Sequence, residues 1–162
     1  MNITVRPIEP KDYKLLEDFL YYAIFIPPGG EVPPRDIIFN PEIFIYIKDF
    51  GAENDIGVVA ELNGEIVGIA WARIIPAYGN IDDKTPELAI SIRPEYRSKG
   101  IGSAIMDCLF IQLNSRGFKR TSLSVQKDNP AVKFYKRLGY QIKEDKLDRA
   151  LHEDYIMVKN LT

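Results

Sequence analysis

The sequence predicts an α/β fold, with a mixed central sheet of about six to seven strands flanked by about four helices. Three observations lead to this prediction. A strong hairpin signal in the first half of the chain requires antiparallel strands. In the second half, strand patterns alternate with helical patterns, which is typical of parallel crossover connections. The length of 162 residues, of which 46% are hydrophobic, fits one domain with its own core, and no linker or repeat divides the chain.

The first third of the chain predicts short elements separated by turns. Residues 3–5 alternate between apolar and polar side chains and predict a first strand. Apolar residues at helical spacing predict an amphipathic helix from about Pro10. Prolines and glycines within 27–34 exclude a regular element there. A second helix is expected over 40–51, because this stretch starts with Asn-Pro and ends at a glycine.

The strongest local signal is a hairpin in the middle of the chain. The runs 56–62 and 65–75 are rich in strand-forming residues and flank Asn63-Gly64. This pair suits a type I′ turn, because both central residues of such a turn need positive φ. A loop containing proline and glycine then leads to a short strand over 87–92, which a proline-containing turn ends.

Two helices and three strands are expected in the second half. An apolar stripe predicts a helix over 100–116, and alternation predicts a strand over 120–126. A short helix is expected within 129–139, with asparagine as N-cap, proline as first residue and glycine as stop. Two last strands are expected over 140–146 and 154–160. The predicted order is therefore β, α, α, β, β, β, α, β, α, β, β.

Composition argues against several classes of function. The formal net charge is −2 and no long basic run occurs, so no nucleic-acid partner is expected. With one cysteine, Cys108, and one histidine, His152, neither a disulfide framework nor a metal site is expected; Cys108 should belong to the core and His152 should be solvated. The N-terminus lacks a signal-peptide pattern, and no stretch approaches roughly 18 apolar residues. We therefore expect a cytoplasmic protein with no membrane partner.

The segment 97–102 reads Arg-Ser-Lys-Gly-Ile-Gly and lies where a strand and a turn lead into a helix. The first N–H groups of a helix have no partner within the helix, and the helix dipole favours negative charge there. Gly100 and Gly102 would let an anion approach the backbone closely, and Arg97 and Lys99 add positive charge. A glycine pair alone could equally serve a tight turn, so the surrounding sequence decides between the two interpretations.

Two motifs resemble those of a known family. The stretch 87–104 resembles motif A of the GNAT superfamily of N-acetyltransferases: a strand, a proline-containing turn, and Arg/Gln-x-x-Gly-x-Gly/Ala opening a helix. The stretch 129–140, Asn-Pro-Ala-Val-Lys-Phe-Tyr-Lys-Arg-Leu-Gly-Tyr, resembles the second signature of that family. Two motifs in the correct order are more specific than either alone. The resemblance covers essentially the whole chain and implies a single GNAT acetyltransferase domain over 1–162 that uses acetyl-CoA as co-substrate, without a metal.

The resemblance also implies which residues bind acetyl-CoA. In this family the pantetheine arm lies along the strand before the pyrophosphate loop and hydrogen-bonds to its backbone, as an added strand does. The loop and the start of the next helix hold the pyrophosphate, and a later asparagine also contacts the cofactor. The matching residues are Ile90, Ser91 and Ile92 for the arm, Arg97, Ser98, Lys99, Gly100, Ile101, Gly102 and Ser103 for the pyrophosphate, and Asn129.

For the chemistry, the resemblance implies direct transfer of acetyl from the thioester to a primary amine in a ternary complex. Tyr135 matches the position that hydrogen-bonds or protonates the CoA sulfur, although helical spacing alone would make it a core aromatic residue. Glu87 opens the strand beside the thioester, where several family members place a catalytic base. It could instead be a solvated carboxylate at a strand end, with the amine proton relayed to bulk solvent through water.

Other parts of the chain must recognise the acceptor. In this family, the segment after the first helix and the last strand pair usually build the acceptor pocket. Here that segment, 21–50, is rich in proline and aromatic residues, which suits a partly apolar pocket, an interface such as that of a homodimer, or core packing. Small-molecule and peptide amines both remain open as acceptors. A non-catalytic acetyl-CoA-binding module and a nucleotide-binding domain of another class also remain, although the usual nucleotide-binding glycine motifs are absent.

Overall fold

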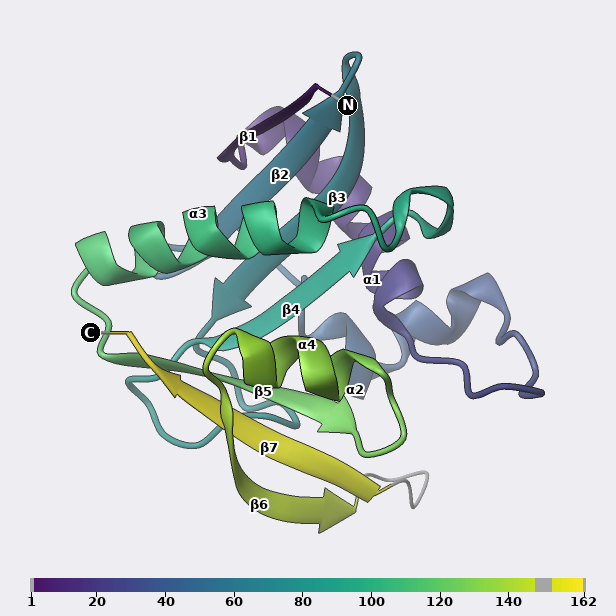
Figure 1. Ribbon diagram of the computed structural model, residues 1–162, viewed down its shortest axis with the longest axis vertical. Coiled ribbons are helices and arrows are strands. Elements are labelled where there is room, and N and C mark those ends of the chain that lie inside the picture. Colours follow the sequence, from purple (N-terminus) through teal and green to yellow (C-terminus); the bar gives the residue numbers. More distant parts are fainter. Residues whose placement is uncertain (1, 148–152, 162) are drawn as a thin grey trace.

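The computed structural model describes residues 2–147 and 153–161, and within them seven strands form one mixed sheet (Figure 1). The strand order is β1-β2-β3-β4-β5-β7-β6, and only the pair of β4 and β5 is parallel in this part of the chain. This confirms the predicted mixed sheet; His152 lies outside the described residues. The strands are β1 (Ile3–Pro7), β2 (Ile56–Leu62), β3 (Glu65–Arg73), β4 (Glu87–Ile92), β5 (Arg120–Gln126), β6 (Gln141–Leu147) and β7 (Glu153–Asn160).

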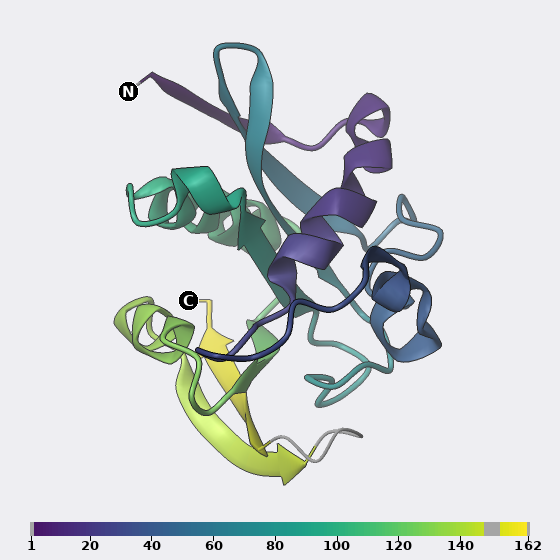
Figure 2. The same ribbon diagram turned by 90° about the vertical axis from the view of Figure 1, so that its right-hand side faces the viewer.

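Helices cover both faces of the sheet (Figures 1 and 2). One face carries α1 and the short α2, and the other carries α3 and α4, so that each face buries its own apolar cluster. None of the described helices combines the length and apolarity that crossing a membrane would need. The helices are α1 (Leu16–Ala23), α2 (Pro41–Phe44), α3 (Ile101–Ser115) and α4 (Ala131–Arg137), with 3₁₀ helices η1 (Pro10–Leu15), η2 (Arg35–Phe39) and η3 (Pro94–Tyr96).

The hairpin of β2 and β3 forms as predicted. Asn63 and Gly64 have φ angles of 53° and 81°. Both values lie in the left-handed region, which a type I′ turn requires. Glycines with positive φ also follow α3 and α4, at Gly117 and Gly139. Each glycine stands where the sequence predicts the end of a helix.

The helix predicted over 40–51 is wrong in length, because α2 spans only four residues. Two side chains of β3 donate hydrogen bonds to the backbone carbonyl groups of the two residues that directly follow α2. Ile45 O accepts a hydrogen bond from Arg73 Nη1 at 2.9 Å, and Tyr46 O accepts one from Trp71 Nε1 at 2.9 Å. These tertiary bonds override the helical pattern, and the chain continues as turns across the face of the sheet.

Successive side chains of β4 point to opposite faces of the sheet. Those at the even positions of 88–92 pack in the cluster with α3 and α4. Those at odd positions, from Glu87 to Ser91, point toward α1 and α2. Ser91 fastens α1 to the strand, since its hydroxyl donates a hydrogen bond to Phe19 O at 2.6 Å.

β4 and β5 lie side by side at one end only. Their single register pair joins Glu87 to Ser122, and the N–H of Ser122 donates to Pro86 O at 3.0 Å. Beyond this pair the two strands separate toward the end of β4, as Figure 1 shows. An edge of β4 is therefore left uncovered in the middle of the sheet, between α3 and α4.

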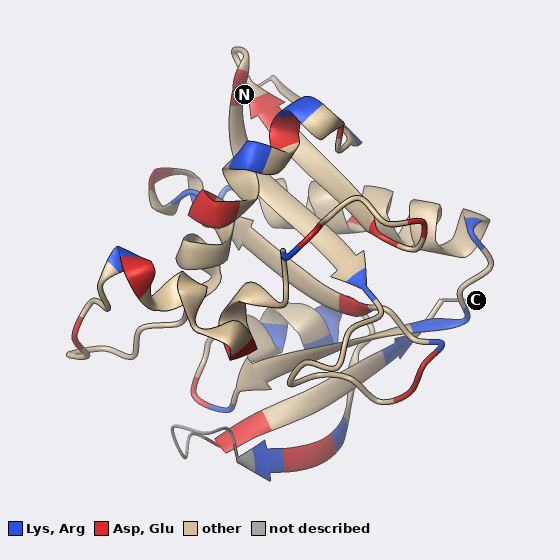
Figure 3. Ribbon diagram, turned by 180° about the vertical axis from the view of Figure 1, so that it is seen from behind, with Lys and Arg blue, Asp and Glu red and all other residues tan. Residues whose placement is uncertain are grey.

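β6 forms an outer edge of the sheet and carries four charged residues in succession, at 143–146. All four are exposed, and both signs of charge appear along the strand in Figure 3. An edge strand can pair with another chain, and charged side chains oppose such pairing. This edge is thereby protected against strand addition.

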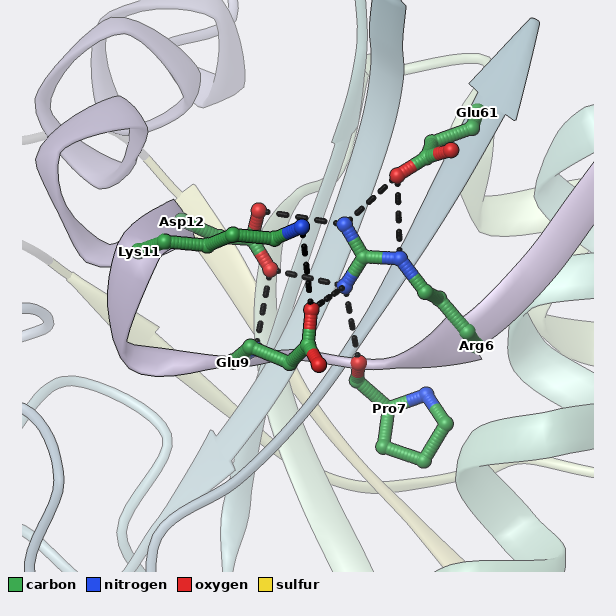
Figure 4. Close-up of polar contacts among 6 residues, drawn as sticks. All are labelled: Arg6, Pro7, Glu9, Lys11, Asp12 and Glu61. Atoms are coloured by element: carbon green, nitrogen blue, oxygen red, sulfur yellow. Dashed lines mark hydrogen bonds and ion pairs between the residues drawn. The ribbon is translucent and has the colours of Figure 1, made fainter. Parts of the chain in front are cut away.

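Arg6 connects β1, β2 and η1 through a network of ion pairs (Figure 4). Its guanidinium donates to Asp12 Oδ2 at 2.8 Å and to Glu61 Oε1 at 2.6 Å. Asp12 is 4% exposed and also accepts a hydrogen bond from the N–H of Glu9 at 2.8 Å. The hydrogen bond from Arg6 lowers the pKa of Asp12. Lys11, in contrast, pairs at 3.4 Å with the exposed carboxylate of Glu9.

We expect Asp12→Asn to lower the free energy of unfolding by about 2 kcal/mol at pH 7, because a buried charge-assisted pair is lost. A carboxylate whose pKa is lowered by folding stabilises the protein above its unfolded pKa, and this contribution disappears as the pH falls through the folded pKa. In urea titrations, the difference from wild type should therefore shrink below about pH 4. Lys11→Gln should cost less than about 0.5 kcal/mol. Equal losses in the two variants would contradict this account.

Candidate active site

A groove of about 830 Å³ lies where β4 and β5 separate. The end of α1 and its following loop, the second half of β4, the start of α3, and α4 surround it. Every predicted site residue except Lys99 and Glu87 lines this groove, so both sequence motifs meet there. These lining residues are Ile90, Ser91, Ile92, Arg97, Ser98, Gly100, Ile101, Gly102, Ser103, Asn129 and Tyr135.

The main chain of β4 has a free edge in this groove. The N–H of Arg93 donates to Val67 O on β3, at 2.8 Å. On the other side, Pro86 O accepts a hydrogen bond from the N–H of Ser122 on β5, at 3.0 Å. Because alternate residues of a strand direct their backbone groups to opposite neighbours, odd positions face β3 and even positions face the side of β5. The N–H and C=O of Ile90 and the N–H of Ile92 therefore face the gap, whereas Ile92 O accepts a hydrogen bond from the Arg97 side chain. Of the three residues predicted to contact the pantetheine arm, Ser91 instead bonds toward β3.

Backbone amides dominate the loop that enters α3. Gly100 has a φ of 82°, and no side chain caps the helix that follows it. The first N–H groups of α3 are therefore available to an anion. The Arg97 guanidinium points elsewhere, since it donates to Ile92 O at 3.1 Å and to Tyr22 O at 3.0 Å. Lys99 is exposed and does not line the groove, so Arg97 ties the loop to α1, and the loop offers an anion its backbone N–H groups rather than these two side chains.

We expect Gly100→Ala to weaken CoA binding about tenfold, because a side chain at this φ strains the loop that presents the α3 amides. Gly64→Ala is a matched control. Gly64 has a φ of 81°, and a Cβ at either glycine would meet no atom within 4 Å. Each variant should lose about 1 kcal/mol of folding stability in urea titrations. Calorimetric titration should find reduced CoA affinity for Gly100→Ala alone; equal CoA affinities would refute this role of the loop.

α4 brings Tyr135 to the groove. The N-cap position of this helix is Pro130, one residue later than predicted, and Asn129 lies just before it with its Oδ1 accepting a hydrogen bond from the N–H of Ala131 at 2.9 Å. The ring of Tyr135 packs against Phe134 and Tyr140, at centroid distances of 5.5 and 5.8 Å. Burial raises the pKa of Tyr135 to about 12. The hydroxyl therefore keeps its proton at neutral pH and can act as a hydrogen-bond donor.

Glu87 lies at the start of β4, on the face of the sheet that carries α1 and α2. It is 2% exposed, so it is not a solvated carboxylate at a strand end. The Tyr46 hydroxyl and the Gly79 N–H both donate to its Oε2, the latter at 3.0 Å. Burial raises the pKa of Glu87 to about 7. Three strand positions, about 10 Å, separate Glu87 from Ile90 and the groove.

Sequence reasoning identifies neither Tyr46 nor Gly79 as a partner of Glu87. Tyr46 belongs to the aromatic segment 21–50, but it is 41 positions from Glu87 and no spacing rule connects them. The requirement for glycine at 79 is visible only in three dimensions. A Cβ there would lie 2.7 Å from the carbonyl carbon of Leu123 and 2.8 Å from Glu87 Oε2.

Several other polar side chains are held in structural contacts. Arg73 bonds to Asp55 Oδ1 at 3.0 Å, and both side chains are buried. Asp82 pairs with Arg120 at 2.6 Å. Cys108 is half-buried and packs against the cluster beneath α3. Within the described ranges, no three His, Cys, Asp or Glu side chains gather in an arrangement that could hold a metal ion.

Residues 20–140 match the family model described as "Acetyltransferase (GNAT) family". The chain belongs to this family. An acetyltransferase of Pectobacterium atrosepticum is 32% identical over 103 residues, which cover 63% of this chain and 68% of the relative. Among solved structures, a GNAT-family acetyltransferase from Streptococcus pneumoniae is 25% identical, with a TM-score of 0.72 over 99% of this chain and 100% of the other.

The PaiA N-acetyltransferase of Thermoplasma acidophilum, solved in complex with coenzyme A, is 20% identical with a TM-score of 0.68, over 99% of both chains. At this identity the likeness concerns the fold. The predicted superfamily, fold class and enzyme class are confirmed: this GNAT chain is an N-acetyltransferase.

Proposed function

We propose that this GNAT enzyme transfers an acetyl group from acetyl-CoA directly to a primary amine while both substrates are bound. The observation that carries the proposal is that three features open into one groove: the free edge of β4, the uncapped start of α3 and the side chain of Tyr135. They fit, in this order, the pantetheine arm, the pyrophosphate and the sulfur of the co-substrate.

The fit to the arm and the pyrophosphate rests on backbone groups. The amides of a pantetheine arm can bond to Ile90 and Ile92 as an added strand would, with little demand on side chains. The pyrophosphate oxygens can accept hydrogen bonds from the amides at 100–103, where the helix dipole favours negative charge. A groove of about 830 Å³ is also large enough for a ligand of this size.

The two proton-handling groups lie on opposite faces of the sheet. Tyr135 comes from α4 on one face, whereas Glu87 points toward α1 and α2 on the other. A thioester held between β4 and β5 would be open to an amine from the second face while its sulfur departs toward the first. This separation supports a direct transfer, because the nucleophile and the leaving group need not share space.

Tyr135 would stabilise the departing sulfur by a hydrogen bond. Its pKa of about 12 exceeds that of a free thiol, near 8.5, so full proton transfer to the sulfur would be uphill by about 5 kcal/mol. A hydrogen bond to the developing thiolate requires no such transfer and acts where charge appears in the transition state.

Glu87 would receive the proton of the acceptor amine. Its pKa of about 7 places it close to the working pH, which suits a general base. Because Glu87 does not line the groove, we infer that the proton reaches it through water. The glutamate and the water relay are then parts of one path. The acceptor would be a small-molecule or peptide amine that enters from the face of α1 and α2.

Two measurements test this function. Calorimetric titration with CoA, ATP and NAD should detect binding of CoA; binding of ATP or NAD in its place would contradict the proposal. An assay of thiol release from acetyl-CoA, run against polyamines, amino acids, aminoglycosides and peptides, should then find an amine-dependent rate. If CoA binds but no amine in the panel raises thiol release, the non-catalytic binding module is the better account.

A further inference from the structure

The two oxygens of the Glu87 carboxylate have very different surroundings. Oε2 accepts hydrogen bonds from the Tyr46 hydroxyl and the Gly79 N–H. Oε1 is buried as well but has no hydrogen-bond partner among the described residues. Buried polar atoms in native proteins are nearly all paired, so an exception of this kind points to a functional cause.

We propose that Tyr46 is a positioning residue of the acetyl-transfer reaction, which fixes Oε2 of Glu87 together with the Gly79 N–H and leaves Oε1 to take the proton of the acceptor amine. This proposal rests on the function of Glu87 given above and adds to it the residue that orients the base. Tyr46 does not line the groove, so it acts only through Glu87.

The backbone around Tyr46 is anchored to β3. Trp71, which is 1% exposed, donates from Nε1 to Tyr46 O at 2.9 Å. Arg73 donates from Nη1 to the preceding carbonyl, Ile45 O, at 2.9 Å. Two buried side chains of one strand thus hold the turn that carries Tyr46, and its hydroxyl reaches Glu87 on the next strand. Support of this kind is what keeps a functional group in a fixed geometry.

The second donor, the Gly79 N–H, has an anchor of its own on β5. The Ser122 hydroxyl donates to Gly79 O at 2.7 Å and so holds the loop against β5. A side chain at position 79 would collide with the backbone of Leu123 and with Glu87 Oε2. Two unrelated segments therefore supply the two donors, and both direct them to the same oxygen of Glu87.

The groups that face Glu87 determine the expected effect of removing the Tyr46 hydroxyl. Burial raises the pKa of Glu87, while the hydrogen bonds from Tyr46 and Gly79 and the charge of Lys146 on β6 lower it by less. Arg73 is the register partner of Glu87 on β3, but its guanidinium bonds to another carboxylate. Without the Tyr46 hydroxyl, the carboxylate form of Glu87 loses a donor, and its pKa should rise further.

During the transfer, the amine nitrogen forms the new N–C bond while the C–S bond breaks and the sulfur leaves as a thiolate. One proton leaves the nitrogen and passes through water to Oε1 of Glu87, which becomes a carboxylic acid. Tyr46 keeps its own proton and its bond to Oε2 throughout. Glu87 then releases the proton to solvent, and the carboxylate is restored.

The test is the pH dependence of kcat for Tyr46→Phe, measured with saturating acetyl-CoA and one amine. We expect the midpoint of the acidic limb to move upward by about one pH unit, because one hydrogen bond to a charged group is lost. Tyr13→Phe is the control: Tyr13 packs in the same apolar cluster as Tyr46, with its ring centroid 5.1 Å from that of Phe50, and loss of its hydroxyl should leave the midpoint at the wild-type value. An unmoved midpoint in Tyr46→Phe would overturn the proposal.

Glu87→Gln separates a failure of this proposal from a failure of the proposed base. If Glu87→Gln keeps the wild-type acidic limb, Glu87 is not the base. If that limb disappears in Glu87→Gln but stays unmoved in Tyr46→Phe, Glu87 is the base and Tyr46 does not position it. A carbon-13 NMR titration of the Glu87 carboxyl group gives a readout independent of turnover, and its midpoint should also be higher in Tyr46→Phe.

Discussion

We expect Tyr135→Phe to lower kcat about 100-fold while the dissociation constant of CoA changes less than about threefold. The hydroxyl acts on the sulfur as charge develops there, whereas the ring packs against Phe134 and Tyr140 and is retained in the variant. The loss should therefore fall on the transition state and not on binding. Steady-state kinetics and calorimetric titration with CoA measure the two quantities separately.

Tyr140→Phe is the matched control for this prediction. Tyr140 belongs to the same aromatic cluster, with its ring 5.8 Å from that of Tyr135, and it is 2% exposed. It does not line the groove, so removal of its hydroxyl should leave kcat close to wild type. If Tyr135→Phe turns over at the wild-type rate, or if both variants lose activity equally, the hydroxyl of Tyr135 has no specific function at the sulfur.

The pH profile gives a second check on Tyr135. Burial raises its pKa to about 12, so the hydroxyl remains protonated over the whole range in which the enzyme can be assayed. Tyr135 should consequently contribute no basic limb to kcat below about pH 11. Any limb between pH 5 and 9 must then belong to another group, and Glu87 is the buried candidate.

The sequence predicted most accurately those parts of the fold in which local rules agree. At the hairpin, the Asn63-Gly64 pair and the flanking patterns both favour a type I′ turn, and the structure has that turn. The strand over 87–92 and the helix start after Gly100 have the expected bounds to within one residue, because a proline turn and a glycine punctuate them.

The site was only partly predictable, for physical reasons. The groove depends on the divergence of β4 and β5, which no pattern within either strand encodes, since each strand looks regular by itself. The prediction for 40–51 failed because two side chains of β3 bond to the carbonyls of residues 45 and 46. The same two hydrogen bonds hold Tyr46 beside Glu87. Helical spacing therefore could not predict that Tyr46 is the partner of Glu87.

We expect Glu87→Gln to show its largest effect on stability at high pH. Burial raises the pKa of Glu87 from 4.5 to about 7 on folding, so the folded state binds the proton more tightly than the unfolded state. The free energy of unfolding of wild type should therefore fall as the pH rises through this window, by up to about 3 kcal/mol. Glutamine cannot ionise, so the variant should lack this decline.

Urea titrations at pH 5 and pH 8 measure this difference. Relative to wild type, the free energy of unfolding of Glu87→Gln should gain about 2.5 kcal/mol between the two pH values, and kcat should lose its acidic limb in the same variant. Glu144→Gln removes a charge from an exposed position on β6 and should follow the wild-type slope. If the free energy of unfolding changes equally with pH in all three proteins, folding does not raise the pKa of Glu87. A steeper decline in wild type, together with loss of the acidic limb of kcat in Glu87→Gln, would mean that the enzyme keeps a destabilising buried carboxyl because a group that titrates near neutrality is needed to accept the amine proton.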